Sequence, residues 1–272
     1  MAGLHAAALA ALVSCVMRPP AWATLIFGLV WLLASGISIT AGYHRLFAHR
    51  TYRCSSVITT TYLLLGAAAV QNSALTWASG HRRHHAHTDQ DDDPYDARRG
   101  LWWSHIGWLL QSNRIVDHGN VPDLSRDSLI AIQHRFYVPL AIIMAAAVPA
   151  LIASLWHDAL GGFLWAGCVR LVVQYHVTFA INSVAHRFGA RPYSTAISAR
   201  DNILVAVLTL GEGYHNFHHC FPSDYRNGSR RFDLDATKWF IGALALVGLA
   251  SDLKRASPEA VMRARRGCLP EY

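Results

Sequence analysis

The stretch Gly211-Glu-Gly-Tyr-His-Asn-Phe-His-His219 decides the fold, because it places three imidazoles at positions i, i+3 and i+4. On an α-helix of 3.6 residues per turn, such residues share one face. An earlier stretch, His81-Arg-Arg-His-His85, repeats the spacing. Imidazole is a ligand for iron, copper, zinc and nickel. Two such faces, brought together by the rest of the chain, would hold more than one metal ion.

The composition is that of a membrane protein. Of the 272 residues, 53% are hydrophobic and only 15% are charged, against about 25% charged in ordinary soluble domains. The net charge of +7 comes almost entirely from arginine, since Lys238 and Lys254 are the two lysines. No basic tract interleaves with aromatic residues, so the excess indicates cytoplasmic loops, and we expect no nucleic-acid partner. Five scattered cysteines without a C-x-x-C pair indicate free thiols.

The N-terminal apolar run, residues 4–17, is about as long as a signal peptide. No basic region precedes it, and Arg18-Pro19-Pro20 is a poor cleavage context. We therefore expect it to stay in the mature chain.

Four apolar runs predict membrane spans at residues 4–17, 21–42, 136–156 and 160–181, arranged as two hairpins. Crossing about 30 Å of hydrocarbon takes about 20 helical residues, so the first span is short. The second hairpin closes at His157-Asp158 without a basic residue, whereas the arginines lie in the other loops. The positive-inside rule then places both termini in the cytoplasm. We expect an all-α membrane protein with a cytoplasmic helical cap formed by residues 43–135 and 182–272.

One further apolar run, residues 57–77, is interrupted by Thr59-Thr60-Thr61 and Gln71-Asn72-Ser73, which are costly in lipid. It separates the first histidine cluster from the second. If the clusters bind metal together they lie on one side of the membrane, so this run cannot cross it. We expect it to be buried in protein, to lie in the interface, or to dip in and return. The run at residues 239–250 is expected to form an interfacial or cap helix.

The histidine count predicts two metal ions. Three clusters supply eight of the 16 histidines, which is too many for one ion. A ninth, His186, follows Asn182 at i+4 at the end of the fourth apolar run, and Asn182 is expected to bind through water. The candidate ligands are His44, His49, His81, His84, His85, Asn182, His186, His215, His218 and His219. The other seven, expected to be hydrogen-bonded structural residues, are His5, His87, His105, His118, His134, His157 and His176.

The first cluster has a different spacing, since His44 and His49 are five residues apart. On a straight α-helix they would lie about 140° apart, so we expect the helix to end between them. A metal-bound histidine normally donates its other N–H to a carboxylate or carbonyl. The candidates for this supporting role are Asp89, Asp93, Asp201 and Glu212.

The histidine segments resemble those of the membrane fatty acyl desaturases, specifically the stearoyl-CoA (delta-9) group. The likeness extends through residues 88–108, 191–193, 202–213, 221–225 and 239–254. Any single H-x-x-H-H box is shared with hydroxylases, but the combination is specific. The resemblance implies one integral-membrane desaturase domain over residues 1–272, with four spans, a cytoplasmic active site and two iron ions held by nine histidines.

The resemblance also implies a reaction. Dioxygen is reduced, and two hydrogens are removed from adjacent methylenes of a long acyl chain to give a cis double bond at the 9,10 position. An unactivated methylene has no acidic proton, so side-chain acid–base catalysis cannot break its C–H bond. We therefore expect no catalytic residues beyond the metal ligands. Gln71, Asn72 and Trp77 match positions that line the acyl tunnel or its mouth, the alternative being that Gln71 and Asn72 merely cap a buried helix.

The acyl carrier and the electron donor stay open. Animal acyl-CoA members carry charged residues where this chain has Ser79-Gly80 and Gln111-Ser112-Asn113, for which Arg98, Arg99 and Arg114 are candidate replacements. CoA, a phospholipid or a carrier protein therefore remain as carriers. No electron-transfer domain is appended, as in a bacterial-type member, which implies a separate ferredoxin or small cytochrome with its reductase.

Two other functions remain as alternatives. The first is a di-iron hydroxylase of the same superfamily, acting on alkyl chains or carotenoids. The second is a non-catalytic membrane metal or haem protein. Haem ligation needs histidine pairs on facing helices within the bilayer, and tight triplets beside a polar cap do not fit that pattern.

Overall fold

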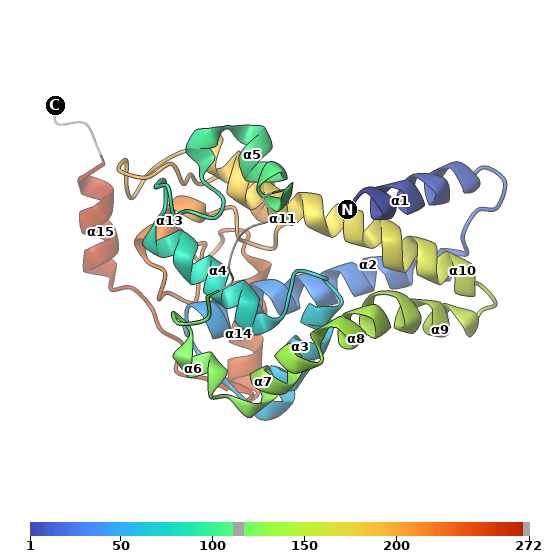
Figure 1. Cartoon of the computed structure of the whole chain (residues 1–272). Helices are drawn as coiled ribbons and strands as arrows, with labels where there is room; N and C mark the ends of the chain where they lie inside the picture. The colour runs from blue at the N-terminus through green and yellow to red at the C-terminus, as the bar shows by residue number, and fades with distance from the viewer. Residues whose placement is uncertain (111–116, 269–272) are drawn as a thin grey trace.

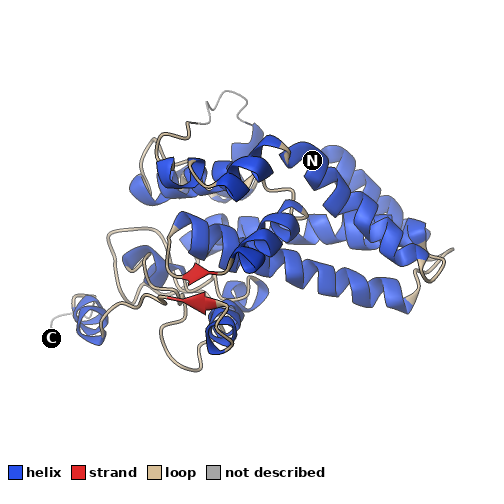
Figure 2. Ribbon diagram, turned by 90° about the horizontal axis from the view of Figure 1, so that it is seen from below, coloured by secondary structure: helices blue, strands red, loops and turns tan. Residues whose placement is uncertain are grey.

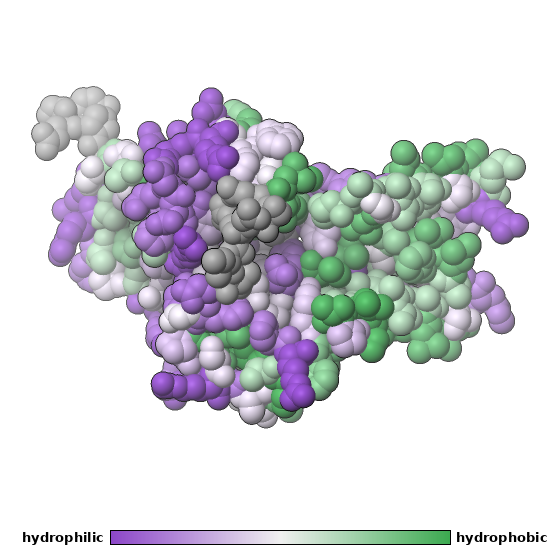
Figure 3. Space-filling view, viewed as in Figure 1, coloured by the Kyte–Doolittle hydropathy of each residue, from purple (hydrophilic) through white to green (hydrophobic). Residues whose placement is uncertain are grey.

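The computed structural model describes residues 1–110 and 117–268 of the chain. Long helices extend to one end of the molecule, and shorter helices and loops gather into a cap at the other (Figure 1). Hydrophobic side chains cover the long helices, whereas hydrophilic ones cover much of the cap (Figure 3). Two sets of residues lie outside the described ones: Gln111, Ser112 and Asn113, which stand where charged residues were looked for, and the candidate replacement Arg114.

Three described helices are long and apolar enough to cross a membrane, Trp22–Ala48, Tyr137–Ser154 and Ala159–Arg187. They match the predicted spans at 21–42, 136–156 and 160–181, although the first and third continue into the cap. Each contains a segment of π-helix. Their parts are α2 (Trp22–Ile37) and η1 (Ser38–Ala48); α8 (Tyr137–Ile142), η4 (Ile143–Ala147) and α9 (Val148–Ser154); and α10 (Ala159–Gly161), η5 (Gly162–Val169) and α11 (Arg170–Arg187).

The first predicted span, residues 4–17, is the short helix α1 (Ala2–Ser14). Its 13 residues extend about 20 Å at 1.5 Å per residue, less than the thickness of the hydrocarbon core. Ala8 and Ala11 are buried where α1 packs on η5 and α11. His5 Nε2 lies 3.0 Å from His176 Nε2, which ties α1 to the third long helix.

As predicted, the run at residues 57–77 does not form a spanning helix. It folds as α3 (Ser56–Ala67) and the start of α4 (Ala74–Ala86), separated by residues 68–73. Ser55 and Ser73 cap the two helices, each accepting a backbone N–H with its hydroxyl. Glycine lets α3 approach η1 closely, because a Cβ at Gly66 would collide with the ring of Tyr43.

The cap consists of short helices around one hydrophobic core, which includes Tyr43, Tyr62, Ile130 and Ile241. One strand pair, β1 (Arg53–Cys54) with β2 (Ala250–Ser251), departs from the all-α prediction (Figure 2). All five cysteines are free, as expected. The remaining elements are η2 (Ala97–Arg99), α5 (Leu101–His105), η3 (Gly107–Leu110), α6 (Pro122–Ser125), α7 (Ser128–Arg135), α12 (Ile203–Leu208), α13 (His215–Cys220), α14 (Ala236–Leu246) and α15 (Pro258–Arg266).

The apolar run at 239–250 lies in α14 and the turn that follows it. The helix has 11 residues, too few to span. One side is buried through Ile241 and Leu244, while Leu246 is 90% exposed and Trp239 48% exposed. This partition is that of a cap helix with an apolar outer side, as predicted.

Candidate metal centre

Nine histidines, which are all of those predicted as ligands, converge in two groups. Within each group the available ligand atoms lie within 4.8 Å of one another. The first group is His44, His49, His81, His85 and His218, and the second is His84, His186, His215 and His219. Among the described residues, none of the other seven histidines belongs to either group.

The two H-x-x-H-H segments divide their imidazoles between the groups. On α4, His81 and His85 belong to the first group and His84 to the second. On α13 the division is reversed, because His215 and His219 belong to the second group and His218 to the first. At 100° per residue, i+4 is rotated by about 40° from i and i+3 by about 60° in the opposite sense, so within one face the i+3 residue points to the other side of the face. Each helix therefore contributes to both groups.

The helix ends at Ala48, between His44 and His49 as predicted, but its last segment is a π-helix. The segment η1 continues as a π-helix, and the His49 N–H donates to the His44 carbonyl at 3.1 Å. An i→i+5 hydrogen bond brings residues five apart onto one face. The ring centroids of His44 and His49 are 4.8 Å apart, and both residues belong to the first group.

The ring nitrogens point at one another in a way that suits a shared ion. In the first group the Nε2 atoms of His44 and His218 are 3.0 Å apart, and those of His218 and His85 are 2.9 Å apart. In the second group the Nε2 atoms of His215 and His186 are 3.1 Å apart. Two nitrogens about 2.1 Å from one ion, at right angles, would lie about 3 Å apart. The donors present therefore fit a metal ion in each group.

One nitrogen supports this interpretation independently. His84 Nε2 is buried and has no hydrogen-bond partner among the described residues. Its Nδ1 lies 2.8 Å from Asp93 Oδ1, so the ring is oriented and the other nitrogen is left available. A buried polar atom without a partner is costly unless a ligand completes it.

Two of the four predicted supporting carboxylates contact the rings of candidate ligands directly. Glu212 Oε2 lies 2.6 Å from His44 Nδ1, and Asp93 contacts His84 as described. These contacts fix the ring orientation and leave Nε2 for an ion. Burial alone would raise the pKa of Glu212, but His44 and Arg45 lower it to about 2. Glu212 is therefore an ionised acceptor.

The other two carboxylates do not contact a candidate ligand ring and act through a neighbouring group. Asp89 accepts a hydrogen bond from the Ser198 hydroxyl at 2.5 Å, and Ser198 Oγ in turn lies 2.7 Å from His186 Nδ1. Asp201 accepts the backbone N–H of Asn216 at 2.9 Å and so holds the start of α13. Ser198 was not predicted, because a serine outside the histidine segments carries no ligand-spacing signal.

A buried arginine supports Glu212 from its far side and was also missed. Arg45 is 1% exposed, and its guanidinium donates to Glu212 Oε1 at 2.8 Å and to Asp235 Oδ1 at 2.9 Å. It also donates to the Tyr225 carbonyl at 2.8 Å. An arginine directly after a ligand histidine, inside an apolar helix, was the available signal.

Burial keeps six of the candidate ligands neutral. It lowers the pKa of each of these imidazoles well below the ordinary value, because a charged ring would lose its hydration and be repelled by its neighbours. Neutral imidazole is the form that binds metal. The rings concerned are those of His49, His81, His85, His215, His218 and His219.

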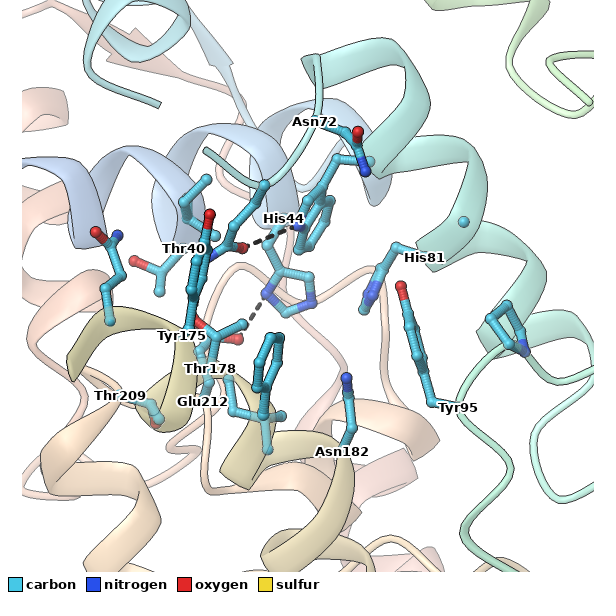
Figure 4. A pocket seen from close by; sticks show the side chains of 18 of the residues that line it. Thr40, His44, Asn72, His81, Tyr95, Tyr175, Thr178, Asn182, Thr209 and Glu212 are labelled. Carbon is cyan, nitrogen blue, oxygen red and sulfur yellow. Dashed lines mark hydrogen bonds and ion pairs between the residues drawn. The ribbon is translucent and has the colours of Figure 1, made fainter. Parts of the chain in front are cut away.

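A cavity of about 840 Å³ adjoins the two groups, within the range of ligand-binding pockets. It reaches from His44, His81 and Glu212 to apolar side chains such as Leu32 of α2 and Ile39 of η1. Figure 4 shows His44 and His81 beside this space, and Asn182 pointing into it from α11. Asn182 lies one helical turn before His186, so it faces the cavity next to the second group.

The three predicted substrate-contacting residues, Gln71, Asn72 and Trp77, all line this cavity. Trp77 stacks on the ring of His81, with centroids 4.9 Å apart and planes at 21°. Its Nε1 donates to Gln71 Oε1 at 3.3 Å. The wall of the cavity formed by Gln71 and Trp77 is therefore in stacking contact with the ring of a candidate ligand, His81.

A sequence profile described as fatty acid desaturase matches residues 20–237. The chain belongs to the fatty acid desaturase family. It is 44% identical over 233 residues to a "Probable acyl-CoA desaturase" of Schizosaccharomyces pombe, an alignment covering 85% of this chain and 49% of that protein. It is 43% identical over 242 residues to "Acyl-CoA desaturase 1" of Saccharomyces cerevisiae, covering 88% of this chain and 48% of that protein.

Animal members of the family are similar over more of their length. The chain is 37% identical over 246 residues to the "Stearoyl-CoA desaturase" of Sus scrofa, covering 88% of this chain and 68% of that protein. It spans about half the length of the two yeast desaturases. The resemblance found in the histidine segments is thus confirmed at the level of the family.

Proposed function

We propose that this desaturase family member is an O2-dependent fatty acyl desaturase, which introduces a cis double bond at the 9,10 position of a long saturated acyl chain. The observation that carries the proposal is the pair of histidine groups adjoining a cavity of about 840 Å³. The names of the yeast and animal relatives support the substrate class. The cofactors proposed are two iron ions, one per group.

In this proposal the first ion is held by His44, His49, His81, His85 and His218, and the second by His84, His186, His215 and His219, with Asn182 acting through water. Iron bound there would supply an oxidant strong enough to break an unactivated C–H bond. The protein supplies position: the cavity buries the apolar chain, excludes water, and holds one pair of carbons beside the histidine groups.

We also propose that the molecule is one membrane domain over residues 1–272, with α1 as a short fourth span paired with α2. The cap, both termini and the histidine groups then lie in the cytoplasm. Asp158 supports the hairpin arrangement, because it accepts the Ala21 N–H at 3.1 Å and the Thr24 hydroxyl at 2.5 Å at the far end of the long helices. The loops at that end carry little positive charge.

The proposed partners are the acyl substrate, O2, membrane lipid and a separate electron donor, either a ferredoxin or a small cytochrome with its reductase. The carrier is CoA, a phospholipid or a carrier protein. Arg98 is paired with Asp91 and Asp96, and Arg99 stacks on Trp103 at 3.2 Å. Both side chains are thus engaged within the cap, which favours a carrier recognised without them.

The test is expression of the full chain in a host unable to make monounsaturated fatty acids, followed by gas chromatography of its lipids. We expect a new cis-monounsaturated acid, and we expect His218→Ala to abolish it and to lower the iron bound by the purified protein. His157→Asn is the matched control, because His157 lies in the exposed turn after α9 with a φ of 60° that asparagine tolerates. Hydroxylated product without new unsaturation would contradict the proposal and favour the hydroxylase, while a Soret band would favour a haem protein.

A further inference from the structure

Three histidines outside the two groups contact one another in a row. His5 Nε2 of α1 lies 3.0 Å from His176 Nε2 of α11, and His176 Nδ1 lies 3.0 Å from His105 Nε2 of α5. His5, His176 and His105, here called the imidazole chain, therefore join three helices that are distant in the sequence. Ionisable side chains on membrane-spanning helices are costly and usually have a function, so we expect the imidazole chain to have one.

Both ends of the imidazole chain lead to a backbone carbonyl. At one end His5 Nδ1 lies 3.0 Å from the Met1 carbonyl oxygen. At the other end His105 Nδ1 lies 2.9 Å from Ser183 Oγ, and the Ser183 hydroxyl donates to the Phe179 carbonyl at 2.8 Å. A carbonyl oxygen can only accept. The row from Met1 to Phe179 thus contains five contacts, and each contact needs one proton.

The neutral groups supply one proton too few for this row. A neutral imidazole carries one N–H, and a hydroxyl carries one O–H, so three rings and Ser183 offer four protons for five contacts. A fifth proton makes one ring an imidazolium, which donates from both nitrogens and completes every contact. Without that proton, two acceptor atoms face each other at one point in the row, which is unfavourable.

The surroundings limit the imidazole chain to a single added charge. Among the described residues, no aspartate or glutamate lies on α1, α5 or α11, or on the segments η2, η3 and η5 beside them. Asp96, which precedes η2, is paired with Arg98. Burial and a charge on His176 lower the pKa of His105, which disfavours a second proton. Besides the Met1 amine, the other titratable side chains on these elements are Arg99, Cys168, Arg170, Tyr175, His186 and Arg187.

The imidazole chain lies at the rim of the cavity. Met1 is 46% exposed and also lines the cavity, as do Val177 of α11 and Leu109 of η3, the segment that follows α5. The N-terminus lies beside α11 (Figure 1). His5 is close to the start of α1, and His105 is the last residue of α5. The imidazole chain therefore bonds the start of α1 and the end of α5 to α11 beside this rim.

We propose that the imidazole chain is a latch, closed by one shared proton, which holds α1 against α11 at the rim of the cavity. When the proton is lost, one contact fails, and the start of α1 is released together with Met1. That this release opens an acyl cavity rests on the proposed function, whereas the latch itself does not.

The direction of the pH dependence follows from where the proton is bound more tightly. Separated, solvated imidazoles have a pKa of about 6.5. The closed latch binds the proton more tightly than they do, because the proton completes the row. The closed state is therefore fully favoured below about pH 6.5 and is weakened as the pH rises above it, by up to about tenfold per pH unit for one proton.

The test measures hydrogen–deuterium exchange of the α1 backbone amides in the purified full chain in detergent, with rates corrected for intrinsic base catalysis. Between about pH 6 and about pH 8.5 we expect the protection of α1 in the wild type to fall about tenfold. His5→Phe removes α1 from the row, and the three remaining contacts are satisfied by three neutral groups, so α1 should exchange fast at every pH. Leu9→Phe, an exposed change on the same helix, is the matched control and should exchange like the wild type.

His105→Phe separates the need for the proton from the attachment of α1. It leaves the contacts of His5 with His176 and with the Met1 carbonyl, which two neutral rings satisfy. We expect α1 to stay protected in this variant, equally at every pH.

A wild-type pH dependence that persists in His105→Phe overturns the inference, and so does protection of wild-type α1 that is constant with pH. If His5→Phe does not accumulate, the wild type and His105→Phe decide. Exchange is read without activity, so a chain that makes no unsaturated acid refutes the proposed function alone, and the exchange data still decide on the latch.

Discussion

Replacing Glu212 with glutamine tests how the first histidine group is held. The carboxylate of Glu212 faces donors on every side: His44 Nδ1 at 2.6 Å, Arg45 Nη2 at 2.8 Å, and Asn227 Nδ2 at 2.7 Å. It is 3% exposed, so water cannot replace a lost partner. Glutamine has nearly the same shape but offers one acceptor oxygen and one NH2 donor.

The size of the effect follows from counting donors. Whichever way the amide of the Glu212→Gln variant turns, its NH2 meets a donor, either the guanidinium of Arg45 or the N–H of His44. One buried donor is then left unsatisfied, at a cost of about 1–3 kcal/mol. If His44 loses its partner, its tautomer and ring orientation are no longer fixed, and removal of such contacts typically weakens metal binding about 10–100-fold. We therefore expect iron affinity at the first group to fall by about that factor.

The assay is iron retention under competition. Purified wild-type and Glu212→Gln proteins are titrated with a chelator, and iron per chain is measured by mass spectrometry. The chelator concentration at which the variant loses its first ion should be about 10–100-fold lower. Glu259→Gln, an exposed change in the first turn of α15, serves as the control. Equal retention in wild type and Glu212→Gln would refute the reasoning that the ionised carboxylate orients His44.

Three further outcomes are expected. Gly66→Ala should lower the free energy of unfolding by about 1–3 kcal/mol, because the added Cβ would collide with Tyr43. Gly242→Ala places its Cβ in open space and should not lower it, and thermal unfolding in detergent measures both variants. Burial raises the pKa of Asp201 to about 6, so the folded state binds its proton more tightly than the unfolded state, and stability is lost as pH rises from about 4 through 6. Asp201→Asn should remove that pH dependence of the melting temperature. The same dependence on pH in the variant and the wild type would contradict the assignment to Asp201. Stripping iron should lower the melting temperature, because an ion at 100 times its Kd adds about 2.7 kcal/mol per site.

The histidines that gather in the two groups could be predicted because their spacing is encoded locally. A triplet at i, i+3 and i+4 predicts one face of a helix from the local sequence alone. Their division between two groups could not be predicted, because it depends on how α4 and α13 face each other. The π-helical turn between His44 and His49 was missed for a related reason: the 3.6-residue period describes only α-helix, and nothing in the residues announces an i→i+5 bond.

The contacts that support the histidine rings show that sequence reasoning reaches only residues close together in the chain. Asp93 and His84 are nine residues apart and were within reach of sequence reasoning. Arg45 and Asp235 are 190 residues apart, and only the folded cap brings them together. The same holds for the strand pair at Arg53 and Ser251. The apolar run at 57–77 is an intermediate case. Its polar interruptions predicted that it would not span, but they did not predict the hydrogen bonds from Arg170 and Tyr175 to the carbonyls of Ala68 and Val70.

The shared helices make the two histidine groups interdependent. Because α4 gives two imidazoles to the first group and one to the second, and α13 gives one and two, an ion in either group ties the same pair of helices together. If both groups hold an ion, loss of one would leave α4 and α13 joined through the other alone. The freed imidazoles, buried with ring nitrogens 2.9 to 3.0 Å apart, would then repel one another through their lone pairs. A weakened first group must therefore raise the cost of keeping the second ordered. The loss of iron in Glu212→Gln should for this reason exceed one ion per chain as chelator is added, in a transition steeper than two independent sites would give.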